Sequence, residues 1–465
     1  MLDAETMHRL AKMALDAGEA NSPEAAVALF KQYRIRISLG RGWAASLAGQ
    51  ACMLTALNTS VRAFLGGVEV QGDLDQQLSV PLFEGRRAGD VIEELGGHPC
   101  TDARARLPTL VIGETPAEPA DGFRLQLGWN GWCAWAAPAQ RAGEVTAARD
   151  NPLAGVAAAA LGVSEAFLFV RGDLLEAGNR TVGLSLWNPL AIGDWRDHGG
   201  PDLQYLPKAL WLVGLGHLGQ AYAWTLSMLP YPTASRPHLV LQDFDKAAKS
   251  NLSTCMLLGP TDIGKRKVRL VAERLEQAGF CTDLVERRFS ADHRVLSDEP
   301  TIALVGVDNI SARRCIDSAG FDLVVEAGLG SGYRDFRNIR THTFPGPRTA
   351  SQVWPAEAGA QAATDLNETY KKLAQERGDL CGMTMLASRA VATPFVGSLA
   401  AALVLAEVMR PLHGGGIHAV LDIQMKKPAF RMGADAVRQA GLMPAFLEAD
   451  WPAALALRRA VAVPE

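Results

Sequence analysis

The sequence predicts an α/β protein of two tandem Rossmann-like domains, with boundaries near 1–190 and 201–465. The first observation is at residues 209–219, where an apolar strand runs into a G-x-G-x-x-G turn and a helical pattern. The second is the apolar strand at residues 238–245, which ends in acidic residues. The third is an internal repeat, which assigns a similar unit to the first half. A Gly-Gly-Pro run within 188–208 predicts the linker.

The first predicted domain begins with two short helices within residues 1–32, where Ser22 before a proline is typical of a helix start. Residues 35–45 then look like a worn copy of the strand and glycine turn at 209–219. Ala45 stands where the third glycine is expected. The copy therefore keeps a strand and a turn but loses part of the phosphate-binding pattern.

The repeat is clearest in two alanine-rich segments. Residues 151–161 and 393–403 share Pro, Gly, three alanines and Leu without a gap, and 242 residues separate Pro152 from Pro394. A shared ancestral unit explains this match. The alternative is an alanine-rich helix that arose twice, because alanine is abundant here and is a strong helix former.

The glycine turn in the second domain has a chemical reason. Gly214, Gly216 and Gly219 let a nucleotide approach the backbone at a helix N-terminus, where free N–H groups and the helix dipole favour phosphate. Asp243, at the end of the next strand, suits a ribose hydroxyl. These features alone leave a nicotinamide-dependent oxidoreductase open, because many dinucleotide-binding enzymes share them.

Polar motifs that follow the glycine turn narrow the choice. They are Asp243-Phe-Asp245, Ser250-Asn251-Leu252, Asp262-Ile-Gly264-Lys-Arg-Lys267 and Leu304-Val-Gly-Val-Asp308-Asn309. In this order and spacing they resemble the motifs of the ThiF/MoeB/ubiquitin-activating enzyme superfamily. Its members adenylate the C-terminal glycine of a ubiquitin-like or sulfur-carrier protein. The alternative is an ordinary Rossmann domain with chance polar loops.

The resemblance implies ATP and Mg²⁺ as cofactors and a role for each motif. Asp243 and Asp245 would bind the nucleotide, with Asp243 on the ribose, and Asn251 would contact the phosphates. Lys267 would be the point charge for the triphosphate. Asp308 would hold magnesium, a hard cation that prefers oxygen ligands.

The chain departs from the family pattern at one cation. Family members have an arginine two positions after Ser-Asn-Leu, where this chain has Thr254. Lys265, Arg266 or an arginine from elsewhere is then needed as a substitute. Family members also direct an arginine from an N-terminal helix at the γ-phosphate. Arg9 is the candidate for that role, although a solvated helical arginine is the favoured interpretation.

The first copy lacks most of the chemistry, and its strand 110–113 ends in Glu114 where the second copy has Asp308. One inactive and one active domain in a single chain resemble the ubiquitin-type activating enzymes, whereas bacterial sulfur-carrier enzymes pair two identical subunits. We therefore expect tandem adenylation domains, the N-terminal one degenerate, with one ATP per chain. The sequence leaves the oligomeric state open, and a homodimer is possible.

Most of the residues added in the second copy fall between Asp308 and Pro394. In the superfamily this is the place of the crossover loop and of the thioester cysteine, and here it corresponds to about 328–392, with a helix expected from Asp365 to Arg377. The resemblance implies Cys381 as the nucleophile, since it lies where compact, ubiquitin-fold-modifier-type activating enzymes carry their thioester cysteine. A thiolate is needed to take the acyl group from AMP, and a nearby helix N-terminus can lower its pKa. The alternative is a small buried cysteine that packs under the helix.

Composition narrows the remaining classes. The 465 residues carry a net charge of −4, which implies no broad basic patch for nucleic acid. No apolar run of about 18 residues is apparent, so a membrane span is not expected. The N-terminus lacks the layout of a signal peptide. Seven scattered cysteines form no C-x-x-C pair, which fits a reducing cytoplasm and no structural zinc.

The resemblance therefore implies an ATP-dependent activating enzyme of bacterial origin for a ubiquitin-like protein, in the cytoplasm. The modifier would be adenylated, loaded on Cys381 and passed to a conjugating enzyme; enzymes of this type occur in operons tied to phage defence. Two alternatives stay open. One is adenylation without a thioester, on a sulfur carrier or a peptide, and the other is a NAD-dependent oxidoreductase.

Overall fold

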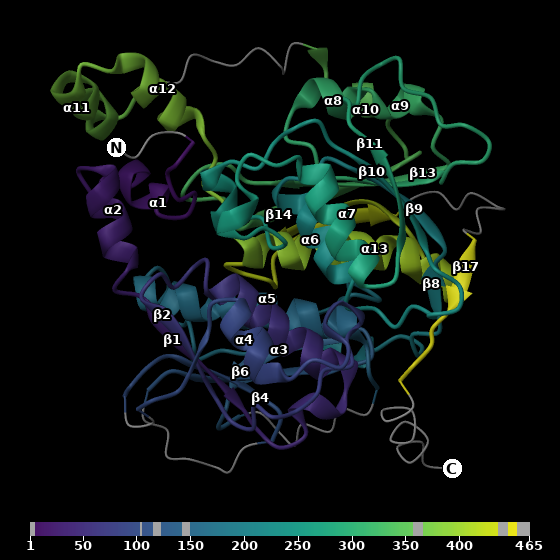
Figure 1. Cartoon of the computed structure of the whole chain (residues 1–465), viewed down its shortest axis with the longest axis horizontal. Coiled ribbons are helices and arrows are strands. Elements are labelled where there is room, and N and C mark those ends of the chain that lie inside the picture. The colour runs from purple at the N-terminus through teal and green to yellow at the C-terminus, as the bar shows by residue number, and fades with distance from the viewer. Residues whose placement is uncertain are drawn as a thin grey trace.

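The computed structural model describes residues 5–102, 105–114, 122–141, 149–356, 366–435 and 445–452. It is mixed α/β, with two sheets and the helices α5 (Pro152–Arg171) and α13 (Pro394–Leu412) packed against each other between them (Figure 1). The other helices are α1 (Lys12–Asp16), α2 (Pro23–Phe30), α3 (Leu47–Ser60), α4 (Ala88–Glu94), α6 (His217–Leu226), α7 (Lys267–Gln277), α8 (Ile310–Arg314), α9 (Ile316–Ala319), α10 (Ala350–Val353), α11 (Glu368–Arg377) and α12 (Leu380–Ser388).

The first sheet has the strand order β3-β2-β1-β4-β5-β6-β7. Its strands are β1 (Arg34–Leu39), β2 (Gly67–Gln71), β3 (His98–Pro99), β4 (Thr109–Ile112), β5 (Arg124–Asn130), β6 (Cys133–Pro138) and β7 (Val182–Ser185). Strands β1 to β5 pair in parallel, and β6 and β7 continue the sheet antiparallel.

The second sheet has the order β11-β10-β9-β12-β13-β14-β15-β16. Its strands are β9 (Ala209–Val213), β10 (His238–Gln242), β11 (Cys281–Val285), β12 (Ile302–Val305), β13 (Leu323–Leu329), β14 (Asn338–Phe344), β15 (His418–Gln424) and β16 (Arg431–Asp435). It repeats the first sheet strand for strand, parallel to β13 and then antiparallel, and adds β16 at the edge. The predicted α/β fold of two tandem units is confirmed.

The apolar helices α5 and α13 form the core between the sheets, and α3 and α6 pack on them. Both are long and apolar enough to cross a membrane, so the expectation that no such run exists is wrong. In the fold, however, 89% and 94% of the residues in their most apolar stretches are buried. Helices that are apolar all round are expected where both faces are covered by protein, and packing between two sheets explains this composition.

The N-terminal helices and the segment near Cys381 form one corner of the molecule (Figure 1). Ser22 caps α2 by accepting a hydrogen bond from Ala25 N at 3.0 Å, which confirms the predicted helix start. The expected helix from 365 to 377 is α11, which begins at Glu368; residue 365 lies outside the described residues. Tyr370 of α11 donates its hydroxyl to Asp16 at 2.6 Å, so the lobe formed by α11 and α12 rests on α1.

A short third sheet pairs β8 (Tyr205–Pro207) with β17 (Phe446–Glu448). Two 3₁₀ helices also position the site, η1 (Trp43–Ala45) in the first domain and η4 (Lys249–Ser253) in the second. The others are η2 (Pro81–Phe83), η3 (Trp195–Asp197) and η5 (Pro260–Asp262).

Candidate functional site

The glycine turn after β9 is as tight as the sequence predicts. Gly214 has φ +83°, and a Cβ on Gly219 would lie 1.9 Å from the Gly214 carbonyl oxygen. Gly216 is the N-cap of α6, and no side chain caps this helix. A Cβ at Gly216 would meet nothing within 4 Å. The turn therefore leaves open space beside Gly216, at a helix N-terminus whose N–H groups and dipole favour an anion.

Two aspartates and a lysine meet at the carboxyl end of β10. Asp243 accepts hydrogen bonds from Leu215 N at 2.6 Å and from Asp245 N at 2.7 Å, so it links the glycine turn to its own loop. Lys267, the first residue of α7, is buried, and its Nζ lies 3.1 Å from Asp245 Oδ2. The structure thus brings together three residues that the sequence separates by 24 positions or fewer.

The charges in this group are coupled. Burial raises the pKa of Asp243, although Lys267 opposes the shift. Burial lowers the pKa of Lys267, but the carboxylates of Asp243 and Asp245 outweigh it and the net direction is upward. Lys267 therefore stays a cation at neutral pH, as a phosphate-binding role requires.

Asn251 lies in η4, and its Oδ1 accepts a hydrogen bond from Ala248 N at 2.9 Å. The acceptor side of the amide thus shapes the loop, which leaves the NH₂ group to donate to a phosphate. The loop that follows is held from the first domain. Arg62, which is directly beyond α3, donates to the carbonyl oxygens of Leu252 at 3.1 Å and Leu258 at 3.2 Å.

Asp308 lies exposed after β12, one strand from the glycine turn in the sheet order. Within the described residues its carboxylate accepts no hydrogen bond, and no group of three or more His, Cys, Asp or Glu side chains could hold a metal. An exposed carboxylate still fits Mg²⁺, which commonly takes one or two carboxylates together with substrate phosphates. The metal assignment of Asp308 stays a prediction.

Arg9 lies in a turn outside any helix and is only partly exposed, so the interpretation as a solvated helical arginine is wrong. It lies before α1 and is half-buried, and its backbone N–H donates to Ser253 Oγ at 3.2 Å. Burial and then the charge of Arg389 lower the pKa of Arg9, while Cys255 and Asp308 oppose the shift. The N-terminal segment is folded over η4, a long-range contact that a local helical pattern does not reveal.

The other substitutes for the missing arginine are already engaged. Lys265 pairs with Asp262 at 3.1 Å, and Arg266 donates to the carbonyl oxygen of Phe244. Thr254 itself is buried. Lys265 and Arg266 are therefore both held by protein oxygens in the loop.

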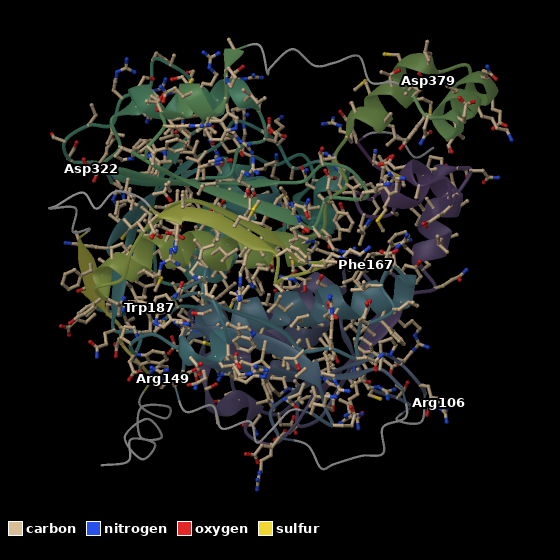
Figure 2. The ribbon with its side chains drawn as sticks, turned by 180° about the vertical axis from the view of Figure 1, so that it is seen from behind. Arg106, Arg149, Phe167, Trp187, Asp322 and Asp379 are labelled. Atoms are coloured by element: carbon tan, nitrogen blue, oxygen red, sulfur yellow. The ribbon has the colours of Figure 1, made fainter. Side chains whose placement is uncertain are left out.

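Cys381 lies in the first turn of α12, where Asp379 caps the helix by accepting from Gly382 N at 2.7 Å. All seven cysteines are described, and Cys381 alone is exposed, so the alternative of a buried packing cysteine is wrong. It is not brought to the Lys267 group: Figure 2 shows Asp379 in a lobe at the periphery of the molecule. Cys255, in contrast, is fully buried, and burial raises the pKa of its thiol to about 11.

The glycine turn and the position of Asp308 have counterparts in the first domain. Its glycine turn differs from the expectation that Ala45 replaces the third glycine. Gly49 takes that role instead, since its Cβ would lie 2.1 Å from the Trp43 carbonyl oxygen. Glu114, which corresponds to Asp308 in the repeat, forms an ion pair with Arg41 of the first domain's glycine turn. The inserted η1 shifts the glycine by four positions, which a gap-free comparison misses.

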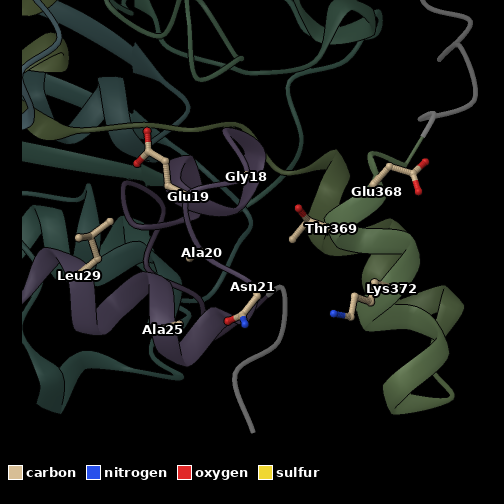
Figure 3. Close-up of a pocket in the computed structure, with 9 residues that line it drawn as sticks. All are labelled: Gly18, Glu19, Ala20, Asn21, Ala25, Leu29, Glu368, Thr369 and Lys372. Atoms are coloured by element: carbon tan, nitrogen blue, oxygen red, sulfur yellow. The ribbon is translucent and has the colours of Figure 1, made fainter.

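A cavity of about 530 Å³ lies away from these residues, between the turn joining α1 to α2 and helix α11 (Figure 3). Charged side chains of both signs line it, including Glu19, Glu368 and Lys372. It contains none of the predicted site residues. The candidate site is therefore defined by the strand ends and the glycine turn, not by this cavity.

Comparisons with known proteins agree with the two-domain organisation. A family model described as the BilD C-terminal domain matches residues 206–415, and one described as the BilD N-terminal domain matches residues 34–186. The bacterial E1-like protein BilD of Collimonas sp. (strain OK412) is 43% identical over 417 residues, which are 89% of this chain and 90% of that protein.

Two solved structures are more distant. Escherichia coli MccB with ATP has 15% identity and a TM-score of 0.32, and the match covers 51% of this chain and 66% of MccB. The E. coli tRNA N6-threonylcarbamoyladenosine dehydratase TcdA has 15% identity and a TM-score of 0.31, over 44% of this chain and 86% of TcdA. At these scores the likeness carries no argument about activity.

Proposed function

The chain belongs to the BilD family of bacterial E1-like proteins, and we propose that it activates a ubiquitin-like protein by ATP-dependent adenylation of its C-terminus. One observation carries the proposal. The glycine turn before the uncapped helix α6 is linked by Asp243 to the buried Lys267, whose charge is paired with Asp243 and Asp245. Such a group can bind the phosphates of a nucleotide through backbone N–H donors and a fixed point charge.

In the proposed first step, a carboxylate oxygen of the modifier attacks the α-phosphorus of ATP and pyrophosphate leaves. Lys267 stabilises the charge that develops on the phosphates, and the α6 N–H groups hold them in line. Asp308 would hold Mg²⁺, which neutralises phosphate charge when bound. Arg9 reaches the same edge from the N-terminal segment and would take the γ-phosphate.

In the proposed second step, the Cys381 thiolate attacks the acyl carbon, a thioester forms and AMP leaves. Its exposure on α12 supports this assignment, because the acyl group must then be passed to a conjugating enzyme. The lobe must approach the adenylate for transfer; in the structure it contacts α1 through the Tyr370 hydroxyl, which donates to Asp16. We propose the cytoplasm as the location and phage defence as the setting.

The test separates adenylation from thioester formation with the cognate modifier. Cys381→Ala is expected to keep ATP–pyrophosphate exchange and to lose the thiol-sensitive enzyme–modifier band on non-reducing gels. Lys267→Ala is expected to lose both, because no acyl-AMP forms. Cys281→Ala, at a partly exposed cysteine on β11, is the matched control and should behave as the wild type.

A thiol-sensitive band that persists in Cys381→Ala would move the nucleophile to another cysteine. Exchange without any band in the wild type would favour adenylation alone, on a sulfur carrier or a peptide. No exchange, together with an absorbance change on adding NAD(H), would favour the oxidoreductase alternative.

A further inference from the structure

The nucleotide loop lacks the family arginine at Thr254, and the described contacts separate the possible substitutes. Cations near the loop that already use their donors on protein oxygens are Lys265, Arg266 and Arg62. Arg9 and Arg389 differ, since the part of the chain that the structure describes gives neither guanidinium a hydrogen bond or an ion pair. Both are half-buried, which leaves two charged groups short of partners.

The backbone places Arg389 at the carboxyl edge of the second sheet. It directly follows α12, and two residues later Val391 N donates to the Ser331 carbonyl oxygen at 2.9 Å. Ser331 lies just beyond the end of β13, and β13 pairs with β12, which leads to Asp308. Ligands of open α/β sheets bind at this edge, outside the carboxyl ends of the strands.

The other end of the same segment contacts the glycine turn. A Cβ on Gly397 would lie 2.5 Å from Nε2 of His217, the first residue of α6. The chain from Arg389 to Gly397 therefore runs from the end of β13 to the N-terminus of α6, and this path crosses the edge where the triphosphate is expected. Arg389 also lies close enough to Arg9 to repel it. A polyanion between two such cations would relieve that repulsion.

We propose that Arg389 binds the β- and γ-phosphates of ATP and replaces the arginine that is missing at Thr254. This inference rests on the proposed function and deepens it at the same site. The planar guanidinium can bind two phosphate oxygens at once, which a lysine cannot. Because Arg389 ends the helix that carries Cys381, the same side chain connects the bound triphosphate to the cysteine lobe.

The test measures ATP and AMP binding by calorimetry, with no modifier present. Arg389→Gln is expected to weaken ATP binding roughly 10- to 100-fold, as expected for loss of a charge-assisted hydrogen-bonded pair. AMP binding should change by no more than about twofold, because AMP lacks the β- and γ-phosphates. Arg389→Lys should fall between the wild type and Arg389→Gln, since it keeps the charge but loses the fork.

Arg334→Ala is the control for loss of one positive charge. Arg334 is exposed in the loop after β13 and stacks on Tyr333 at 5.2 Å, so ATP affinity should stay within about twofold. Wild-type ATP affinity in Arg389→Gln, or an equal loss for ATP and AMP, would overturn the inference. If the wild-type protein binds ATP but catalyses no pyrophosphate exchange, the proposed function is refuted, whereas the role of Arg389 in ATP binding still stands.

Discussion

Helices α3 and α6 follow the glycine turns of the two domains, but side chains cap the N-terminus of α3 and not that of α6. The N–H groups of Leu47 and Ala48 in α3 donate to the Asp150 carboxylate, each at 2.9 Å. Ser46 caps the same helix by accepting from Gly49 N at 2.9 Å. Helix α6 has no side-chain cap. A protein carboxylate thus occupies the anion position in the first domain, and the second domain leaves it open.

The repeat supplies the reason. Asp150 precedes the N-cap of α5, and the residue that precedes the N-cap of α13 is Ala392. Helices α5 and α13 closely approach α3 and α6, respectively. A Cβ on Gly155 of α5 would lie 2.2 Å from the Ala48 carbonyl oxygen, and a Cβ on Gly397 of α13 would meet the first residue of α6. Capping side chains, Asp150 and Ser46, and not a different fold, therefore distinguish the filled helix N-terminus from the open one.

A buried glutamine plays the same part in both domains. Gln50, the fourth residue of α3, donates to the Ala44 carbonyl oxygen at 2.9 Å and accepts from Ser79 N at 2.6 Å. Gln220, the fourth residue of α6, donates to the Leu215 carbonyl oxygen at 3.1 Å and accepts from the next loop. The first domain thus keeps the hydrogen bonds that hold the glycine turn but lacks the phosphate-binding residues. The structure of the turn and its capacity to bind phosphate can therefore be lost separately.

The largest expected effect compares Asp308 with its counterpart Glu114. Asp308→Ala should reduce magnesium-dependent ATP–pyrophosphate exchange by roughly 10²- to 10³-fold, because phosphate charge then lacks its metal. Glu114→Ala should leave exchange near the wild-type rate, since Glu114 forms only a solvent-exposed pair with Arg41, and such pairs contribute little. Near-normal exchange in Asp308→Ala would remove the metal assignment.

The next largest effect is expected when the N-terminus of α6 is given a carboxylate like the one that caps α3. Ala392→Asp should weaken ATP binding roughly 10- to 100-fold in calorimetry, because a carboxylate would then compete for the α6 N–H groups. Ala392→Asn has nearly the same shape without the charge and should lose less. Unchanged ATP affinity in Ala392→Asp would show that the phosphates do not lie at this helix.

The smallest effect is expected when the carboxylate that caps the N-terminus of α3 is removed. Asp150→Ala should lower the free energy of unfolding by about 1–2 kcal/mol, the usual cost of losing a helix cap. Chemical denaturation measures this, and Asp150→Asn should lose less because it keeps an acceptor oxygen. ATP stoichiometry should stay at one per chain in the wild type and in Asp150→Ala, because the first domain has no equivalent of Lys267. Two ATP per chain would contradict the degenerate first domain.

The sequence by itself determined the α/β fold and the tandem arrangement, and its motifs singled out Asp243, Asp245 and Lys267. The fold and the repeat follow from local patterns, because apolar strands and helices have distinct periodicities. The glycine turn was predictable for the same reason, since its geometry depends on adjacent residues.

Only the tertiary structure decided where Arg9, Asp150 and Arg389 lie. Arg9 is 244 residues from Ser253, whose hydroxyl accepts its backbone N–H, and Asp150 is 103 residues from Leu47. No local pattern marks a side chain whose partner lies so far along the chain. Contacts of this kind form when α5 and α13 pack into one core and bring the two halves together. The packing of that core therefore decides which helix N-terminus is filled and which stays open.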